Sequence, residues 1–305
     1  MIAILGLLFN VVVNYLFIYG KFGLPQLGST GSAMATGIAM WLMLGAMLWW
    51  IHHSPIYKRT FPFTHREMPK WNEIRSMLRI GLPIGVTYFA EVSAFSAVGL
   101  LVARFGVVAI SANQIALNFS SLVFMVPMSL GIALTTRVSQ TLGEGDVVHA
   151  RFVSWTGVGV SLVFAIISAS MMTLLRYQVV SAYTSDPVIQ EVTANLLLLA
   201  AIFQLSDAAQ ITISCALRGY KVTRVPMLIH IMAFYGFAMP IGLVLGLAPD
   251  WMPWHPEKPM EASGFWIGLV LGLTVAAVLL GIFLHRLSST RIAYHLRTNE
   301  SQQIA

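Results

Sequence analysis

The sequence predicts an all-α fold: a polytopic membrane protein whose eight helices cross the bilayer. Two observations lead to this class. Hydrophobic residues make up 57% of the 305 residues and charged residues only 10%, whereas soluble domains carry about 25% charged residues. The apolar residues also gather in unbroken runs of about 20 residues, the length that an α-helix needs to span the hydrocarbon core. A soluble protein with one large core would not need so many such runs.

Charged and turn-rich stretches divide the chain into eight apolar spans. The first span has neither a basic amino-terminal region nor a small-residue cleavage site, so we do not expect a cleavable signal peptide. The third span, from Ile80 to Ala103, contains a single charged residue, Glu91. The expected spans are residues 1–19, 30–51, 80–103, 108–136, 153–175, 188–217, 225–247 and 263–284.

Several spans carry residues that affect their packing. The eighth span contains GxxxGxxxG, and we expect these glycines to form a close-packing face rather than a dimer seam. We expect His230, in the seventh span, to be an interior histidine that is bonded to its neighbours. Prolines are expected to break or bend three spans, and they are tolerated at membrane depth where neighbouring groups satisfy the freed backbone. The prolines are Pro83, Pro127 and Pro240, and the glycines are Gly264, Gly268 and Gly272.

The basic residues orient the chain in the membrane. If the polar loop 52–79 lies in the cytoplasm, eight crossings place fourteen of the eighteen Lys and Arg residues on the inner side. This positive-inside asymmetry predicts that both termini are cytoplasmic. The net charge of +6 therefore orients the protein and does not indicate a nucleic-acid partner. The outer side receives only Lys21, Arg104, Arg176 and Lys258.

The loop 52–79 is also the expected boundary between two parts of the chain. It is the longest polar stretch, and it closes with KWNEIRSMLR, which could form a short amphipathic helix on the inner membrane surface. The expected parts are residues 1–52 with the last two helices of one lobe, a basic linker at 53–79, a six-helix lobe at 80–285 and a cytoplasmic tail at 286–305.

A weak internal repeat is compatible with two related lobes. Gly31 and His52, in and just after the second span, align with Gly264 and His285 of the eighth at the same spacing of 21 residues. Two spans that share a direction suit a parallel repeat. Chance similarity between glycine-rich apolar helices is nearly as good an explanation.

Two acidic residues lie at membrane depth, and we expect them to be functional. Of twelve Asp and Glu residues, ten fall in loops or at span ends, and only Glu91 and Asp207 lie at membrane depth, where an ionised acid costs about 2.5–3.5 kcal/mol on insertion scales. A buried carboxyl group can change its protonation state near neutral pH, or it can stay ionised by holding a cation. The alternative is a protonated acid that only bonds a neighbouring helix, but such bonds contribute about 0.6 kcal/mol on average.

Polar side chains accompany the two acids at helical spacing. Tyr88 precedes Glu91 by one turn, and Phe203 and Gln210 share a helical face with Asp207. In the fourth span, Gln114 and Asn118 lie on a common stripe. Three helices that each present a polar face predict the lining of an internal cavity.

Sequence motifs of enzymes are absent. The chain contains no GxxxxGK[ST], HExxH or GxSxG, and no glycine-rich phosphate loop. GEGD at residues 143–146 is interpreted as a turn that ends a helix. The single cysteine, Cys215, cannot form an intramolecular disulfide and is interpreted as a packing residue. We therefore expect a protein that is not an enzyme.

The chain resembles the NorM-type branch of the multidrug and toxic compound extrusion (MATE) transporters, as found among proteobacterial inner-membrane drug exporters. The likeness rests on motifs that occur in order: GLPIGVTYFAEVSAFSAVGLLV, NQIALNFSSLVFMVPMSLGIALTTRVSQTLGEGD, FQLSDAAQ and LRGYKVTR. NYLFIYGKFGLPQLGSTGSAMATGIA near the amino terminus is similar to the family's fifth helix and the start of its sixth. On this alignment the chain would hold helices five to twelve of twelve, without the helix-one acid implicated in proton coupling.

The resemblance implies two six-helix lobes, alternating access, and export of bulky organic cations driven by Na⁺ or H⁺. It implies no cofactor beyond the coupling ion, a bacterial inner-membrane location among lipids, and a monomer when full-length. Glu91 and Asp207 match the family's two acids of the cation site in the second lobe, where Na⁺ would bind. Phe203 stands where many members have a tyrosine, which removes one possible oxygen ligand and leaves Na⁺ and H⁺ as alternatives.

Two other functions stay open at this point. One is a truncated membrane protein that does not transport, for which we expect no drug export by the 305-residue chain alone. The other is a lipid-linked-saccharide flippase of the wider superfamily, which would need a strongly cationic cavity that the spans do not offer.

Overall fold

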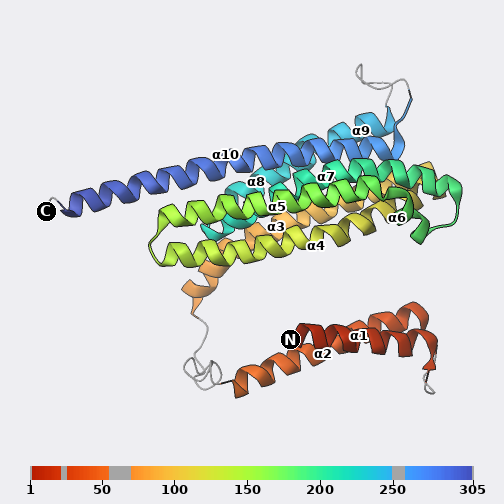
Figure 1. Ribbon diagram of the computed structural model, residues 1–305, viewed down its shortest axis with the longest axis horizontal. Coiled ribbons are helices and arrows are strands. Elements are labelled where there is room, and N and C mark those ends of the chain that lie inside the picture. Colours follow the sequence, from red (N-terminus) through yellow and green to blue (C-terminus); the bar gives the residue numbers. More distant parts are fainter. Residues whose placement is uncertain (1, 22–25, 55–69, 249–257, 304–305) are drawn as a thin grey trace. The chain divides into compact units, whose positions relative to one another are not determined.

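The computed structural model describes residues 2–21, 26–54, 70–248 and 258–303, and every regular element in these ranges is a helix. The chain forms two compact units, residues 1–70 and 71–305 (Figure 1). Seven of the helical segments in the described ranges are long and apolar enough to cross a membrane. The first predicted span is also helical, but its described apolar stretch, Ile4–Tyr19, is shorter than the other seven. The all-α, polytopic fold is confirmed.

The first unit is a helical hairpin of α1 (Ile2–Tyr19) and α2 (Gly28–His53). The backbone amide of Leu27 donates to the carbonyl oxygen of Phe17 at 3.1 Å, which closes the turn between them. A Cβ atom on Gly31 would lie 2.7 Å from the same carbonyl oxygen. The absence of a side chain at Gly31 therefore lets the two helices approach closely.

The second unit contains the remaining helices. Their bounds are α3 (Trp71–Val102), α4 (Val107–Gly143), α5 (Val147–Leu174), α6 (Arg176–Tyr183), α7 (Pro187–Gly219), α8 (Arg224–Ile231), α9 (Met239–Leu247) and α10 (Glu261–Gln303). A 3₁₀ turn, Ala103–Phe105, follows α3, and a π-helical segment, Met232–Ala238, joins α8 to α9.

Two boundaries differ from the sequence prediction. In the segment KWNEIRSMLR, which could have formed a separate helix on the membrane surface, residues 71–79 instead supply the first turns of α3, because no helix-breaking residue separates them from the span. The expected tail from residue 286 continues α10 as far as Gln303.

Pro83 and Pro127, where bends were predicted, do not interrupt α3 or α4, and the Thr87 hydroxyl donates to the carbonyl oxygen of Pro83 at 2.9 Å.

Helix α7 is the centre of the second unit. In its apolar window 67% of the residues are buried, against no more than 39% in any other span of the described chain. It packs against α4, α5 and α10, and these helices run side by side along the unit in Figure 1. A side chain on almost any face of α7 is therefore enclosed by protein, which decides the environment of Asp207.

The ends of two helices are fixed by aspartate caps. Asp146 accepts from the backbone amide of His149 at 2.8 Å and starts α5, and Gly145 before it has φ +86°. GEGD is thus a helix-terminating turn, as predicted. Asp186 caps α7 in the same way, by accepting from the amide of Val188 at 2.9 Å. An acidic side chain at this position also complements the positive end of the helix dipole.

Candidate functional site

The two intramembrane acids lie in the second unit on different helices. Asp207 is on α7 with 5% of its surface exposed, and Glu91 is half-buried on α3. The Glu91 carboxylate acts electrostatically on Asp207, and Arg218 acts on Glu91. The two acids are 116 positions apart in sequence, and their common role in ion binding stays a prediction.

Gln210 links Asp207 to His230 through a buried chain of hydrogen bonds. The amide nitrogen of Gln210 donates to the Oδ1 atom of Asp207 at 3.2 Å, and its oxygen contacts the Nε2 atom of His230. The Nδ1 atom of His230 lies 2.7 Å from the carbonyl oxygen of Pro226. The prediction that His230 is an interior, bonded histidine is confirmed, and its partner connects it to the intramembrane acid.

The contacts of His230 restrict where a proton can sit. Both ring nitrogens of His230 face oxygen atoms, those of Pro226 and Gln210, but a neutral imidazole carries only one N–H. Two arrangements satisfy every contact. In the first, an imidazolium donates to Pro226 and Gln210, while Gln210 donates to an ionised Asp207. In the second, the amide nitrogen and oxygen of Gln210 exchange places, a change that leaves the positions of the heavy atoms the same. A protonated Asp207 then donates to the Gln210 oxygen, and the Gln210 nitrogen donates to a neutral His230. Both hold the same number of protons.

Arg218 and Tyr88 form the cationic side of the site. The Nη1 atom of Arg218 donates to the hydroxyl oxygen of Tyr88 at 2.9 Å, and the guanidinium lies 4.9 Å from the centre of the Tyr88 ring. Arg218 also acts electrostatically on His230. A cation held over an aromatic face in this way is stabilised by the ring quadrupole, so Tyr88 positions the charge that faces Glu91.

Aromatic rings close one side of the acidic cluster. The ring of Phe203 lies edge-on to Phe95 at 5.9 Å and to Trp266 at 5.6 Å between centroids. Phe95 in turn contacts Phe234 of the π-helical segment at 6.2 Å. Edge-on contacts of this kind stabilise buried ring clusters. Phe203 is therefore a packing residue beside Asp207 and offers no ligand oxygen.

Two buried amides beside this cluster carry groups without a protein partner. Both side-chain polar atoms of Gln204, one turn before Asp207, are buried without a hydrogen bond in the described residues. Asn113 accepts from the indole N–H of Trp266 at 3.0 Å, but its own amide nitrogen is unpartnered there. Since buried polar groups are nearly always paired, these two are candidates to contact an ion or a water.

The predicted lining residues of α4 lie outside the buried cluster. Gln114 and Asn118 are exposed on the second unit, and the hydroxyl of Tyr183 donates to the Oδ1 atom of Asn118 at 3.0 Å. The neighbouring Asn113, one position away on the helix, is the residue that points inward. The place of Gln114 and Asn118 on a substrate pathway stays a prediction.

Arg218 is the site residue that sequence reasoning missed. From the sequence, Arg218 is one of the fourteen basic residues expected on the inner side, and no role beside the acids is predicted for it. A usable signal was present, because Asp207, Gln210, Ser214 and Arg218 follow one helical stripe of α7. In the described residues no group of three His, Cys, Asp or Glu side chains gathers to hold a metal ion.

Comparisons with known proteins identify the family of the chain. Residues 83–244 match the family model MatE. The chain is 44% identical over 292 residues to the multidrug resistance protein PmpM of Pseudomonas aeruginosa, with 96% of this chain and 60% of the relative covered. It is 40% identical to the multidrug resistance protein MdtK of Yersinia enterocolitica, with 97% and 64% covered. The chain thus spans about 60% of the length of such relatives.

Solved structures share the fold. A eukaryotic MATE transporter superposes with a TM-score of 0.81 at 23% identity, and 96% of this chain and 64% of that chain are covered. A multidrug resistance MATE family transporter in an outward-facing conformation also gives a TM-score of 0.81, at 18% identity, with 94% and 61% covered.

Proposed function

The chain belongs to the MatE family, and from this premise we propose that it serves as a secondary active exporter of cationic, amphipathic drugs in the bacterial inner membrane. Export is driven by antiport of H⁺ or Na⁺ through alternating access. The observation that carries the proposal is that Asp207 is buried on α7 and bonded to Gln210, while α3, which carries Glu91, meets α7 through the hydrogen bond from Arg218 to Tyr88. The relatives named above are multidrug resistance proteins and not enzymes.

The hydrogen bonds of Gln210 offer a way to couple ion binding to helix movement. Taking one proton from the cluster leaves a neutral His230 beside an ionised Asp207. His230 then donates to either Pro226 or Gln210 but not to both. One buried acceptor loses its partner, which costs about 1–3 kcal/mol. Because His230 is on α8 and Gln210 is on α7, the protonated and deprotonated clusters favour different positions of α8 relative to α7. A coupled exporter requires such a difference between its ion-bound and ion-free states.

Na⁺ would use the same residues through their oxygens. The carboxylates of Glu91 and Asp207 and the unpartnered amide oxygen of Gln204 supply ligands of the hard type that alkali and alkaline-earth cations prefer. Phe203 contributes none. Because the proton-dependent contacts of His230 need no metal, we favour H⁺ as the coupling ion.

Transport in vesicles with separately imposed gradients tests the proposal. The protein, expressed from its complete coding sequence, should accumulate an organic cation when an H⁺ gradient is applied. The Glu91→Gln and Asp207→Asn variants should each reduce accumulation to the background of empty vesicles while inserting normally. Glu191→Gln, which removes an exposed acid from α7, is the matched control and should keep full activity.

Several results would count against the proposal. Full drug export by both acid variants would remove the assigned role of the cluster. Accumulation driven by Na⁺ alone would keep the exporter but contradict the preference for H⁺. No export by the unmodified protein under either gradient would favour a membrane protein that does not transport.

A further inference from the structure

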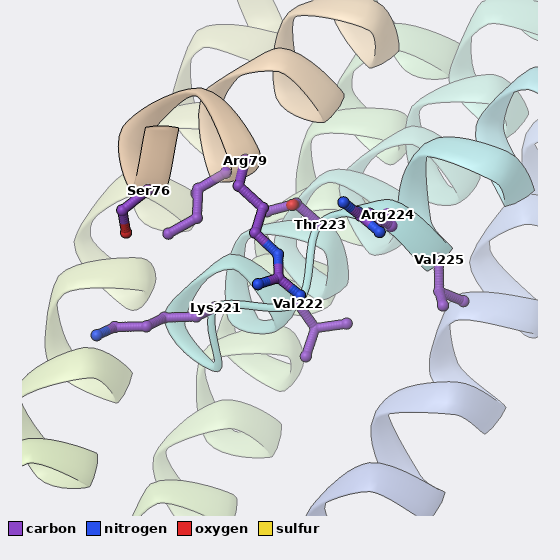
Figure 2. Close-up of a pocket in the computed structure, with 8 residues that line it drawn as sticks. Ser76, Arg79, Lys221, Val222, Thr223, Arg224 and Val225 are labelled. Atoms are coloured by element: carbon purple, nitrogen blue, oxygen red, sulfur yellow. The ribbon is translucent and has the colours of Figure 1, made fainter. Parts of the chain in front are cut away.

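A basic cavity opens at the end of the second unit where α3 begins and α7 turns into α8. The cavity has a volume of about 330 Å³ and lies between Ser76 and Arg79 of α3 and the turn Lys221–Arg224. Figure 2 shows the side chain of Arg79 reaching from α3 toward this turn, beside Thr223 and Arg224. The positive-inside asymmetry assigns this end of the unit to the cytoplasmic face.

Three cationic side chains line this cavity, and a fourth, Arg75, lines the cavity that adjoins it. Arg75 and Arg79 come from α3, and Lys221 and Arg224 from the α7–α8 turn more than 140 positions later in the chain. Within the ranges that the structure describes, none of the four forms a hydrogen bond or an ion pair. Glu73, the acid in the first turn of α3, does not line the cavity. The positive charge is therefore uncompensated by these neighbours.

Backbone and hydroxyl donors complete the basic cavity. Thr223 is 6% exposed, lines the cavity and precedes α8, yet its hydroxyl makes no hydrogen bond to another described residue and caps no backbone amide. The first amides of α8 are unpaired within the helix and carry its positive dipole end. An oxyanion is the partner that accepts from a hydroxyl, from helix-end amides and from guanidinium groups together.

The turn is held in a conformation that favours glycine. Lys221 has φ +60°, and its amide donates to the carbonyl oxygen of Arg218 at 2.8 Å. Left-handed backbone at a residue other than glycine, asparagine or aspartate is strained, and such strain is concentrated at functional sites. A lysine in this position makes the turn less stable than a glycine would, but it places a positive charge at the rim of the basic cavity.

A second cavity continues along α3 toward the membrane interior. It has a volume of about 750 Å³ and shares Ser76, Arg79 and Arg224 with the first. Arg75, Leu78, Arg79 and Leu82 line it at the spacing i, i+3, i+4, i+7, which is one helical face. Leu78 and Leu82 are 52% and 66% exposed. Along this face Leu78 lies between the two arginines, and Leu82 lies about 10 Å deeper than Arg75, at 1.5 Å per residue.

The geometry points to a binding site for an anionic phospholipid of the inner leaflet. The phosphate is held by Arg79, Arg224 and the Thr223 hydroxyl, and an acyl chain lies along Leu78 and Leu82. Free phosphate would bind the basic cavity but has no apolar part to contact the exposed leucines, whereas a phospholipid would contact both. Basic pockets between helices at the cytoplasmic side are suited to anionic headgroups. The positive-inside rule alone does not require basic residues to converge on one cavity.

Lipid retention in native mass spectrometry tests this site. The detergent-purified protein is mixed with phosphatidylglycerol or with phosphatidylcholine, and retained lipid is counted for each variant. Arg79→Gln and Arg224→Gln should each weaken phosphatidylglycerol retention about five-fold and the double variant by more, with phosphatidylcholine unchanged. Arg79→Lys, which keeps the charge, should restore most of the binding. Arg137→Gln, an exposed arginine on α4 away from the cavity, is the matched control and should bind as the unmodified protein does.

Two further variants separate the lipid from other sources of phosphate. Leu78→Ser and Leu82→Ser, which keep the basic cavity, should weaken phosphatidylglycerol binding, and inorganic phosphate should not displace the lipid at equal concentration. Displacement by inorganic phosphate, together with no effect of the leucine changes, would overturn the lipid assignment. An equal loss in Arg137→Gln, or none in the Arg79/Arg224 double variant, would overturn the site itself. Transport activity enters none of these measurements, so the outcome is independent of the proposed export function.

Discussion

Gln210 is the residue on which the polar cluster depends. It contacts both Asp207 and His230, it is fully buried on α7, and its amide can donate or accept on either side. A carboxyl group in this place would add a third acid, and an apolar residue would break the chain. The amide permits a proton to be held at either end without a change in net charge.

Replacement of Gln210 by leucine should break the hydrogen-bonded link between Asp207 and His230. Gln210→Leu keeps most of the volume but leaves Asp207 and His230 buried without their shared partner, which costs about 1–3 kcal/mol per unsatisfied group. We expect a lower thermal midpoint in detergent and loss of H⁺-driven transport. Gln140→Leu, at an exposed position of α4, is the control. Equal midpoints for the two variants would contradict the role given to Gln210.

At the scale of the helices, the glycine face of α10 holds the broken seventh span in place. A Cβ atom on Gly264, Gly268 or Gly272 would lie 2.5 Å from atoms of the facing segments, which are Gly246 on α9 and Ala238 at the end of the π-helical segment. The predicted close-packing face is confirmed. The π-helical segment also reaches α3, where the hydroxyls of Tyr235 and Ser93 lie 2.6 Å apart. The same contact surface thus supports the helix that carries Glu91.

An alanine at Gly268 should separate these helices. Its Cβ atom would approach the carbonyl oxygen of Ala238 at 2.5 Å and the amide nitrogen of Gly242 at 2.6 Å, and backbone atoms cannot rotate away. We expect Gly268→Ala to lower stability by about 1–3 kcal/mol, in spite of the better helix propensity of alanine. On the same helix, Gly281→Ala meets only Ile213 at 3.7 Å and should be neutral or stabilising. Thermal unfolding in detergent compares the two, and equal midpoints would refute the packing argument.

At the scale of the whole molecule, orientation in the membrane decides which end of each unit meets the cytoplasm. The turn between α4 and α5 and the turn between α6 and α7 are separated by a single crossing, α5. The distribution of basic residues predicts that the first turn lies inside and the second outside. The basic cavity belongs to the same side as the α4–α5 turn, because α5 and α7 cross in opposite directions between that turn and the α7–α8 turn.

Labelling of introduced cysteines tests this topology. Cys215 is the chain's single cysteine and is buried, so Cys215→Ala provides a background without thiols. In intact cells a membrane-impermeant maleimide should label Ser185→Cys, and it should label Glu144→Cys only after the cells are opened. Both positions are exposed turn residues, so each is a control for the reactivity of the other. The reverse pattern would invert the proposed orientation.

The fold class, the spans and the positions of the two intramembrane acids follow from the amino-acid sequence alone. Composition and charge spacing are local properties, and a helix in a bilayer satisfies its own backbone, so span positions follow from the chain alone. The helical period also placed Gln210 beside Asp207, and the glycines of α10 on one face.

Only the tertiary structure decided which polar residues meet. That Arg218 lies against Tyr88, that His230 reaches Gln210, and that Asn113 rather than Gln114 points inward depend on how α3, α4, α8 and α10 pack around α7. The same holds for the basic cavity, whose cations come from segments more than 140 positions apart. Helical spacing orders side chains within one helix, but contacts between helices depend on how each is rotated and shifted against its neighbours, and the interlocking of side chains sets this.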